Sequence, residues 1–83
     1  MFKRKKKYPA IVCARTEAAF EDIENSILKD MPVICMKNGD GRFGSITKGE
    51  ILAGNFNIWN RTKEHWEEYE DLKAMLNDGW VVD

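Results

Sequence analysis

Hydrophobic and polar positions repeat with a helical period in the last quarter of the chain, over Thr62–Asp78. At 100° per residue its apolar side chains form one stripe and its carboxylates lie opposite. The stripe comprises Trp66, Tyr69, Leu72 and Leu76, with His65 at its edge. The pattern predicts a long amphipathic helix on a core. Gly79 is expected to end it, and Trp80–Val82 to form a strand.

Two short apolar runs in the first half predict strands, with a helix between them. Tyr8–Ala14 is continuously apolar and β-branched at its centre, which is typical of a buried strand. Pro32–Lys37 is a second run of this kind. Between them, a helix is expected from Thr16 to about Lys29. Its apolar stripe would be Phe20, Ile23 and Ile27.

The middle of the chain begins with a strong turn signal, Asn38–Gly41, because Asn-Gly and Asp-Gly pairs tolerate positive φ. One to three short strands are expected after it, and their number stays open. The candidate strands are Arg42–Thr47, Glu50–Ala53 and Asn55–Trp59. Three glycines at five-residue spacing are interpreted as bends or bulges: Gly44, Gly49 and Gly54.

This order of elements predicts an α+β fold. A βαββαβ chain most economically forms a ferredoxin-like sheet with both helices on one face. Residues 1–7 would be a basic N-terminal tail, and residues 8–83 a single domain. Alternate apolar residues of Ala10–Ala14 and Val33–Met36 would then face away from the helices. An exposed apolar face of that kind is usually covered by a partner, a second copy or a ligand.

Charge is segregated along the chain although the net charge is only −1. Residues 1–15 carry six basic groups and no acidic ones, whereas residues 64–83 carry seven acidic groups and one basic. The two segments can attract each other within the molecule or between copies, or they can attract separate partners. No apolar run approaches the ~20 residues that span a bilayer, so we expect a soluble cytoplasmic protein without membrane contact.

The titratable residues form no recognisable catalytic or metal-binding motif. His65 is the only histidine, and Cys13 and Cys35 lack CxxC spacing. Both cysteines lie in apolar runs, where thiols usually act as small buried hydrophobes. The carboxylates of Glu64–Asp71 fit a hydrated helix face or an acidic docking surface. We therefore expect a non-enzymatic protein with no cofactor and no metal.

Trp59 and Arg61 are the preferred partner-binding pair, since Trp and Arg dominate interface hot spots. Trp59 lies in a polar stretch, and a packed-core role for it remains open. Phe43 and Arg42 complete the candidate protein-binding set. The expected partner is a host protein or a second copy, which would form a homodimer through the sheet.

A nucleic-acid-binding site is the alternative. It would use basic residues for phosphate contacts and aromatic rings for stacking on bases. The candidates are Lys3, Arg4, Lys5, Lys6, Lys7 and Tyr8. The same run also fits a terminus that only confers solubility.

Val33–Leu52 (VICMKNGDGRFGSITKGEIL) resembles short accessory proteins encoded by bacteriophages and prophages. Many of these share an apolar–Cys–apolar–Lys … Thr–x–Gly–Lys–x–Tyr run, in which Glu50 and Leu52 here replace the usual lysine and tyrosine. The ending LKAMLNDGWVV resembles the helix–Gly–Trp–strand closure of small bacterial domains. The phage resemblance implies a small non-enzymatic protein that binds a host macromolecule, for example as an inhibitor.

Overall fold

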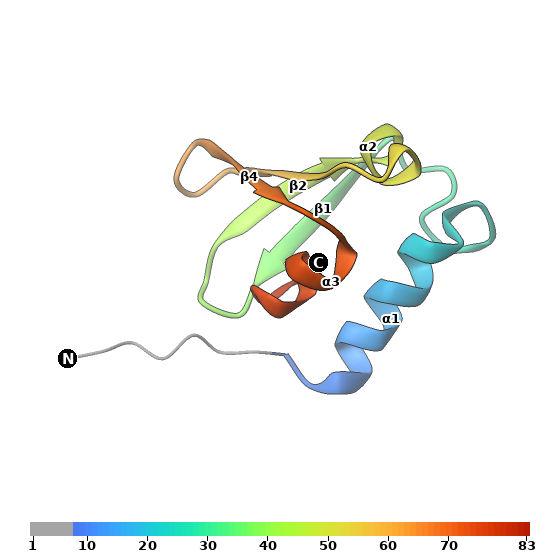
Figure 1. Cartoon of the computed structure of the whole chain (residues 1–83), viewed down its shortest axis with the longest axis horizontal. Helices are drawn as coiled ribbons and strands as arrows, with labels where there is room; N and C mark the ends of the chain where they lie inside the picture. Colours follow the sequence, from blue (N-terminus) through green and yellow to red (C-terminus); the bar gives the residue numbers. More distant parts are fainter. Residues whose placement is uncertain (1–7) are drawn as a thin grey trace.

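A five-stranded antiparallel sheet organises the computed structural model, which describes residues 8–83 (Figure 1). The helices are α1 (Ala10–Glu21), a 3-10 turn η1 (Ile23–Asn25), α2 (Lys48–Ala53) and α3 (Leu72–Asn77). The strands are β1 (Val33–Asn38), β2 (Phe43–Thr47), β3 (Phe56–Asn60), β4 (His65–Tyr69) and β5 (Trp80–Val82). Within the described residues, no helix has the length and apolar character needed to cross a membrane.

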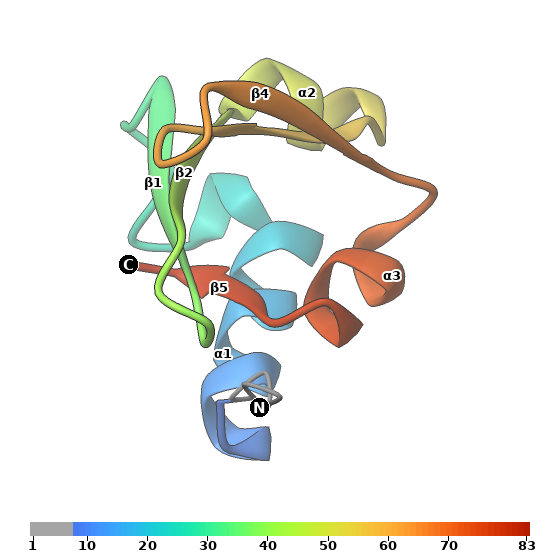
Figure 2. The ribbon, with the colours of Figure 1, turned by 90° about the vertical axis from the view of Figure 1, so that its left-hand side faces the viewer.

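The sheet has the strand order β4-β3-β2-β1-β5. The first four strands form an antiparallel meander, so consecutive strands are neighbours. The chain then passes through α3 and returns on the far side of β1, where β5 pairs antiparallel with it. Figure 2 shows α1 and α3 on the same, inner side of the curved sheet. One face of the sheet is therefore covered by α1 and α3, while α2, which connects β2 to β3, borders the opposite face, where Glu50 Oε2 accepts a hydrogen bond from Asn57 Nδ2 at 3.1 Å.

The hydrophobic core lies between the inner face of the sheet and the helices. Burial alternates along β1 and β2, where Ile34, Met36 and Ile46 are buried and their chain neighbours are more exposed. Such alternation is expected of a sheet with one solvated face. The core comprises Phe20, Ile23, Leu28, Ile34, Met36, Ile46, Ile51, Ile58, Met75 and Trp80.

The predicted α+β class is confirmed, but the order of elements differs from a ferredoxin-like βαββαβ chain. The described chain begins with a helix, and its first four strands are consecutive neighbours. Several local predictions agree with the structure: β1, the strand after Asn38–Gly41, and β5. Gly41 adopts a φ of 97°, and its N–H donates to Asn38 O at 3.0 Å. Gly79 likewise ends α3 with a φ of 96°.

The predicted strand over Tyr8–Ala14 is wrong, because these residues lead into and begin α1. Pro9 occupies the N-cap position, where its missing N–H costs nothing. The buried residues of α1 are Thr16 and Phe20, which lie four positions apart on one helical face. The β-branched run of Ile11 and Val12 was outweighed by this longer helical pattern. The predicted helix from Thr16 to Lys29 therefore starts earlier and ends earlier.

The predicted long helix over Thr62–Asp78 is also wrong. It divides into a turn, β4 and the short helix α3, so β3 gains an antiparallel partner. Asp71 is the N-cap of α3, and its side chain accepts a hydrogen bond from Ala74 N at 2.8 Å. Helix propensity is a weak preference that tertiary pairing overrides. An Asp at an N-cap was the sequence signal for this division.

Glu50–Ala53 is helical rather than a strand. It belongs to α2, where Thr47 accepts a hydrogen bond from Glu50 N at 3.1 Å. Gly54 then adopts a φ of 77° as the C-cap, which is the left-handed conformation that glycine tolerates best. The meander thus contains two strands after the Asn38–Gly41 turn before the chain reaches β4.

Candidate binding face

The side of the sheet opposite α1 and α3 is built from alternate residues of the meander, and we call it the open face. Cys35 is paired with Ser45, Ser45 with Trp59, and Trp59 with Trp66, so these four side chains form one row across the strands. Residues two positions away on each strand share this face. The open face comprises Val33, Cys35, Lys37, Phe43, Ser45, Thr47, Asn57, Trp59, Arg61, Trp66 and Glu68.

Aromatic rings form the apolar centre of the open face. Trp59 and Trp66 pack edge to face, with ring centroids 5.2 Å apart and an interplanar angle of 63°. Trp66 is 60% exposed and Phe43 is 48% exposed. An aromatic pair of this geometry contributes ~0.5–1.5 kcal/mol beyond its buried area, so the rings are held in place. The sheet thus presents rigid, exposed aromatic area to solvent.

Basic groups lie beside these rings. Arg61 N donates to Phe43 O at 2.8 Å, which places Arg61 next to Phe43 in the ladder. Lys37 is paired with Phe43 in the β1–β2 register. The ammonium of Lys37 lies 5.3 Å from the centroid of the Tyr8 ring, a cation–π distance. One end of the open face therefore combines two cations with two aromatic rings.

The opposite side of β2 and β4 carries a cluster of hydrogen-bonded charges around Arg42. Arg42 Nη1 donates to both Glu67 carboxylate oxygens at 2.5 and 2.7 Å, and its Nε donates to Asp40 at 2.8 and 3.0 Å. The guanidinium carbon also lies 5.2 Å from the Trp80 ring centroid. Asn60, which is fully buried, donates to Glu67 Oε2 at 2.5 Å. This cluster joins the two hairpins on the covered side of the sheet.

Tyr69 connects the Arg42 cluster to α3 and β5. Its hydroxyl hydrogen-bonds to Glu67 Oε1 at 2.9 Å and to the Asp78 carboxylate. The same hydroxyl accepts a hydrogen bond from the Trp80 indole N–H at 2.7 Å. Burial, together with the hydrogen bonds to Asp78 and Glu67, raises the pKa of Tyr69 above its ordinary value. Tyr69 therefore stays neutral and holds the C-terminal elements against the meander.

The charges in the Arg42 cluster stabilise one another. Burial alone would raise the pKa of Glu67, but hydrogen bonds from Asn60, Arg42 and Tyr69 outweigh it and lower that pKa. Burial likewise opposes the charge on Arg42, and the carboxylates of Asp40 and Glu67 outweigh it and raise the Arg42 pKa. Paired and hydrogen-bonded in this way, the charges are retained in the fold.

The structure brings three of the four predicted protein-binding residues together: Phe43, Trp59 and Arg61 share the open face. Arg42 lies on the other side, where its side chain is 18% exposed and bound in the charged cluster. Among the nucleic-acid candidates, Tyr8 lies against Lys37. The remaining candidates precede the described residues: Lys3, Arg4, Lys5, Lys6 and Lys7.

Trp66 is the open-face residue that the sequence reasoning missed. The helical stripe placed it in the core, whereas it lies on β4 beside Trp59. The sequence of His65–Tyr69 gave no alternating signal, because Trp66 and Tyr69 have the spacing of one helical face, although in the strand Trp66 is exposed and Tyr69 is partly buried. Cys35 was expected to be buried, and it too is exposed on the open face.

The other titratable candidates have ordinary surroundings. His65 is 55% exposed, with Nε2 3.5 Å from Glu67 Oε2. Cys13 is partly buried, and its thiol donates to Tyr8 O at 3.7 Å. Within residues 8–83, the structure groups no three His, Cys, Asp or Glu side chains in a way that could hold a metal ion.

The two edges of the sheet differ in how they meet their surroundings. At the β5 edge, Val82 N donates to the Thr16 hydroxyl of α1 at 3.2 Å, so the helix covers this edge. At the β4 edge, the strand carries the exposed carboxylate of Glu68 and is flanked by those of Glu64 and Glu70. Charged side chains on an edge strand oppose pairing with another sheet. The β4 edge is therefore poorly suited to pairing with the edge of another sheet.

The described chain is acidic as a whole. Residues 1–7 hold five of the 13 basic side chains and none of the 14 acidic ones, which leaves a net charge of −6 for residues 8–83. Comparison with known proteins adds no further constraint. No protein-family model matches the chain, and neither a curated protein nor a solved structure matches it.

Proposed function

We propose that this protein is a small non-enzymatic binding module that holds a protein partner on its open face. The observation that carries the proposal is the packed pair of partly buried Trp59 and exposed Trp66, with exposed Phe43 on the same face. Rigid aromatic area with an adjacent arginine is the composition of an interface hot spot. The hydrophobic core and the Arg42 cluster lie on the other face, which leaves the open face available for contact.

Charge favours a protein over a nucleic acid as the partner. Residues 8–83 carry a net charge of −6, and Glu68 lies on the open face itself. At long range a phosphate backbone is repelled by the net negative charge of these residues as a whole, whereas a protein interface needs mainly an apolar centre and a polar rim. The partner is a host protein or a second copy, and the resemblance to phage accessory proteins favours an inhibitor of a host protein.

Matched substitutions of two equally exposed apolar residues test the proposal. Trp66 and Leu52 are each 60% exposed, but Leu52 lies on α2, outside the open face. Trp66→Ser is expected to weaken binding to the captured partner, or self-association, by at least ~30-fold, since hot-spot truncation costs 2 kcal/mol or more. Leu52→Ser is expected to change partner binding or self-association by less than ~3-fold.

The measurements are light scattering after size exclusion over a range of concentrations, and affinity capture from a host lysate with quantitative mass spectrometry. The wild type and both variants are run in parallel. A strictly monomeric wild type that captures no protein above the background contradicts the proposal. Equal loss of binding in Trp66→Ser and Leu52→Ser contradicts the assignment to the open face.

Single-stranded nucleic acid is the second candidate, and one observation favours it. Lys37 lies over the Tyr8 ring and is paired with Phe43, Arg61 lies next to Phe43 in the ladder, and the basic residues Lys3–Lys7 directly precede Tyr8 in the chain. Stacking on aromatic rings beside cations is the usual mode of single-strand binding. Titration of a labelled oligonucleotide at two salt concentrations tests it. Phosphate contacts require weaker binding at higher salt, and no binding at low salt rejects this candidate.

A further inference from the structure

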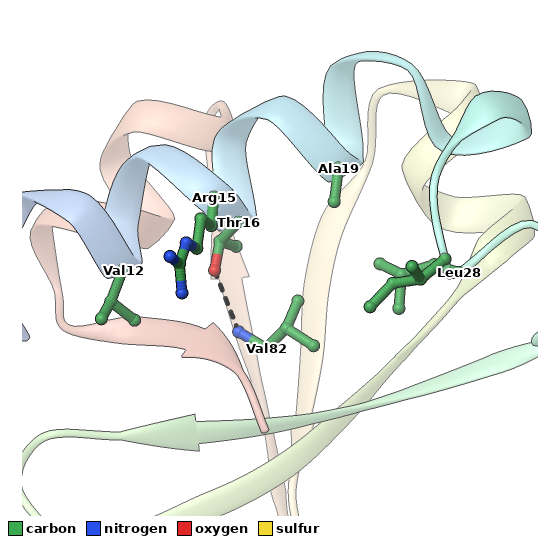
Figure 3. Close-up of a pocket in the computed structure, with 7 residues that line it drawn as sticks. Val12, Arg15, Thr16, Ala19, Leu28 and Val82 are labelled. Atoms are coloured by element: carbon green, nitrogen blue, oxygen red, sulfur yellow. Dashed lines mark hydrogen bonds between the residues drawn. The ribbon is translucent and has the colours of Figure 1, made fainter.

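A second site lies away from the open face, in an apolar pocket between α1, β5 and the segment that follows η1. Its volume is about 230 Å³. Figure 3 shows it beneath α1, beside the hydrogen bond from Val82 N to the Thr16 hydroxyl. The lining residues are Val12, Arg15, Thr16, Ala19, Ile27, Leu28 and Val82. All but Arg15 and Thr16 are apolar.

Arg15 is the charged residue of this lining. Within residues 8–83, its guanidinium makes no ion pair and no side-chain hydrogen bond. A guanidinium beside an apolar wall matches a carboxylate attached to a hydrocarbon chain, because its planar fork of N–H donors fits a carboxylate in a bidentate pair. The Thr16 hydroxyl can also donate a hydrogen bond to a bound carboxylate. Its oxygen accepts from Val82 N, which leaves the hydroxyl proton as a donor.

Ile27 provides an independent reason to expect an apolar occupant. It lines the pocket but is 91% exposed, the largest exposure among the big hydrophobic residues of the described chain. The fold gains almost nothing from this side chain, whereas an aliphatic chain in the pocket would cover it. Burial of apolar area contributes ~25 cal/mol per Å². Ile27 therefore offers exposed apolar area at the rim of the pocket.

The size of the pocket limits the ligand. A dry cavity of ~150 Å³ accommodates benzene, and drug-sized ligands occupy ~300–1,000 Å³. At about 230 Å³, this pocket fits an aliphatic chain of roughly six to eight carbons. We infer that the α1–β5 pocket binds a short-chain aliphatic carboxylate, with its chain against Ala19, Leu28 and Val82 and its carboxylate on Arg15.

The test is an amide-resolved NMR titration of the full chain with hexanoate and, separately, with hexanol. Saturable shifts are expected at Val12, Ala19 and Val82, and not at the Trp59 indole. Hexanoate should bind about fivefold more tightly than hexanol, since a partly exposed ion pair contributes up to ~1 kcal/mol. Equal affinities for the two ligands would overturn the carboxylate assignment, and shifts that never saturate would overturn the pocket.

Three variants separate the contributions. Arg15→Gln is expected to reduce hexanoate affinity to that of hexanol and to leave hexanol unchanged. Arg61→Gln removes an exposed arginine from the open face and should change neither affinity. Ala19→Leu fills the pocket and should abolish binding of both ligands. If Ala19→Leu fails to fold, Val12→Phe provides the same test from the other end of the pocket.

A further titration with acetyl-leucine distinguishes a free aliphatic acid from the C-terminus of a peptide as the ligand. It combines an apolar side chain with a carboxylate that follows a peptide bond. Tighter binding of acetyl-leucine than of hexanoate would overturn the aliphatic acid in favour of a peptide terminus. Weaker binding supports the inference. Because this site shares no residue with the open face, its failure leaves the protein-binding proposal unaffected.

Discussion

Ile58 and Trp59 are neighbours on β3, yet their side chains lie on opposite faces of the sheet and have opposite surroundings. Ile58 is fully buried in the core, while Trp59 packs against Trp66 on the open face. The covered face also contains the Arg42 cluster. Among the described residues, every buried side-chain nitrogen or oxygen has a hydrogen-bond partner. The comparison shows that the core and the Arg42 cluster lie on one face of the sheet, and the exposed aromatic rings that we propose bind a partner lie on the other.

The largest expected effect separates these two neighbours directly. Ile58→Ala leaves a cavity in the core and is expected to lower the free energy of unfolding by about 3 kcal/mol. Trp59→Ala removes a partly exposed ring and is expected to cost about 1 kcal/mol through its contact with Trp66. Urea unfolding followed by circular dichroism measures both. A larger loss for Trp59→Ala than for Ile58→Ala would break the division between the faces.

Gly44 gives the next effect, because it lies on the covered face where β3 approaches closely. An added Cβ would lie 2.7 Å from both Ile58 Cγ2 and Trp59 O, closer than real Cβ atoms come. Gly44→Ala is therefore expected to lower the free energy of unfolding by about 2 kcal/mol. Gly49→Ala in α2, where no atom lies within 4 Å of the added Cβ, should be neutral or stabilising. Thermal unfolding of the two variants decides, and equal melting temperatures would contradict the close approach.

Glu67 gives the smallest effect and a pH signature. Glu67→Gln weakens its hydrogen bonds with Arg42 and Asn60 and is expected to cost about 1.5 kcal/mol at pH 7. The pKa of Glu67 is lowered by folding, so its contribution is complete above its ordinary value of 4.5 and is lost as the pH falls through the lowered value. The wild type and Glu67→Gln should therefore converge in stability in acid.

Urea unfolding at several pH values measures this convergence. Glu68→Gln, on the neighbouring position but on the open face, is the control. Glu68→Gln removes the same formal charge as Glu67→Gln, but Glu68 makes no hydrogen bond with the Arg42 cluster. We therefore expect the free energy of unfolding to change by less than ~0.5 kcal/mol at every pH. A stability difference between Glu67→Gln and the wild type that stays constant below pH 4.5 would contradict the lowered pKa of Glu67.

The candidate site was predictable only in part. Trp59, Phe43 and Arg61 were identified from residue type and from their polar neighbours, and the structure places them on one face. Trp66 was not identified, because its helical spacing with Tyr69 and Leu72 predicted a core position. Arg42 was grouped with Phe43 as its chain neighbour, but adjacent residues of a strand point to opposite faces. Alternate residues of Val33–Met36 were expected to face away from the helices, and Val33 and Cys35 do, since they alternate with buried Ile34 and Met36.

The sequence by itself determined the features that depend on a few neighbouring residues. These are the turn at Asn38–Gly41, the short strand of alternating burial before it, and the glycine that ends α3 before the final strand. Each rests on local backbone preferences or on period-two burial, which need no distant partner.

Only the tertiary structure decided whether His65–Tyr69 is helix or strand. Its glutamates favour a helix, but β3 lacks a second neighbour without it, and Glu67 reaches Arg42 and Asn60 only from a strand. The same holds for α1, where Thr16 closes the β5 edge 66 positions further along the chain. Pairing between distant segments outweighs local propensity because it buries more surface and satisfies more polar groups than a solvated helix does.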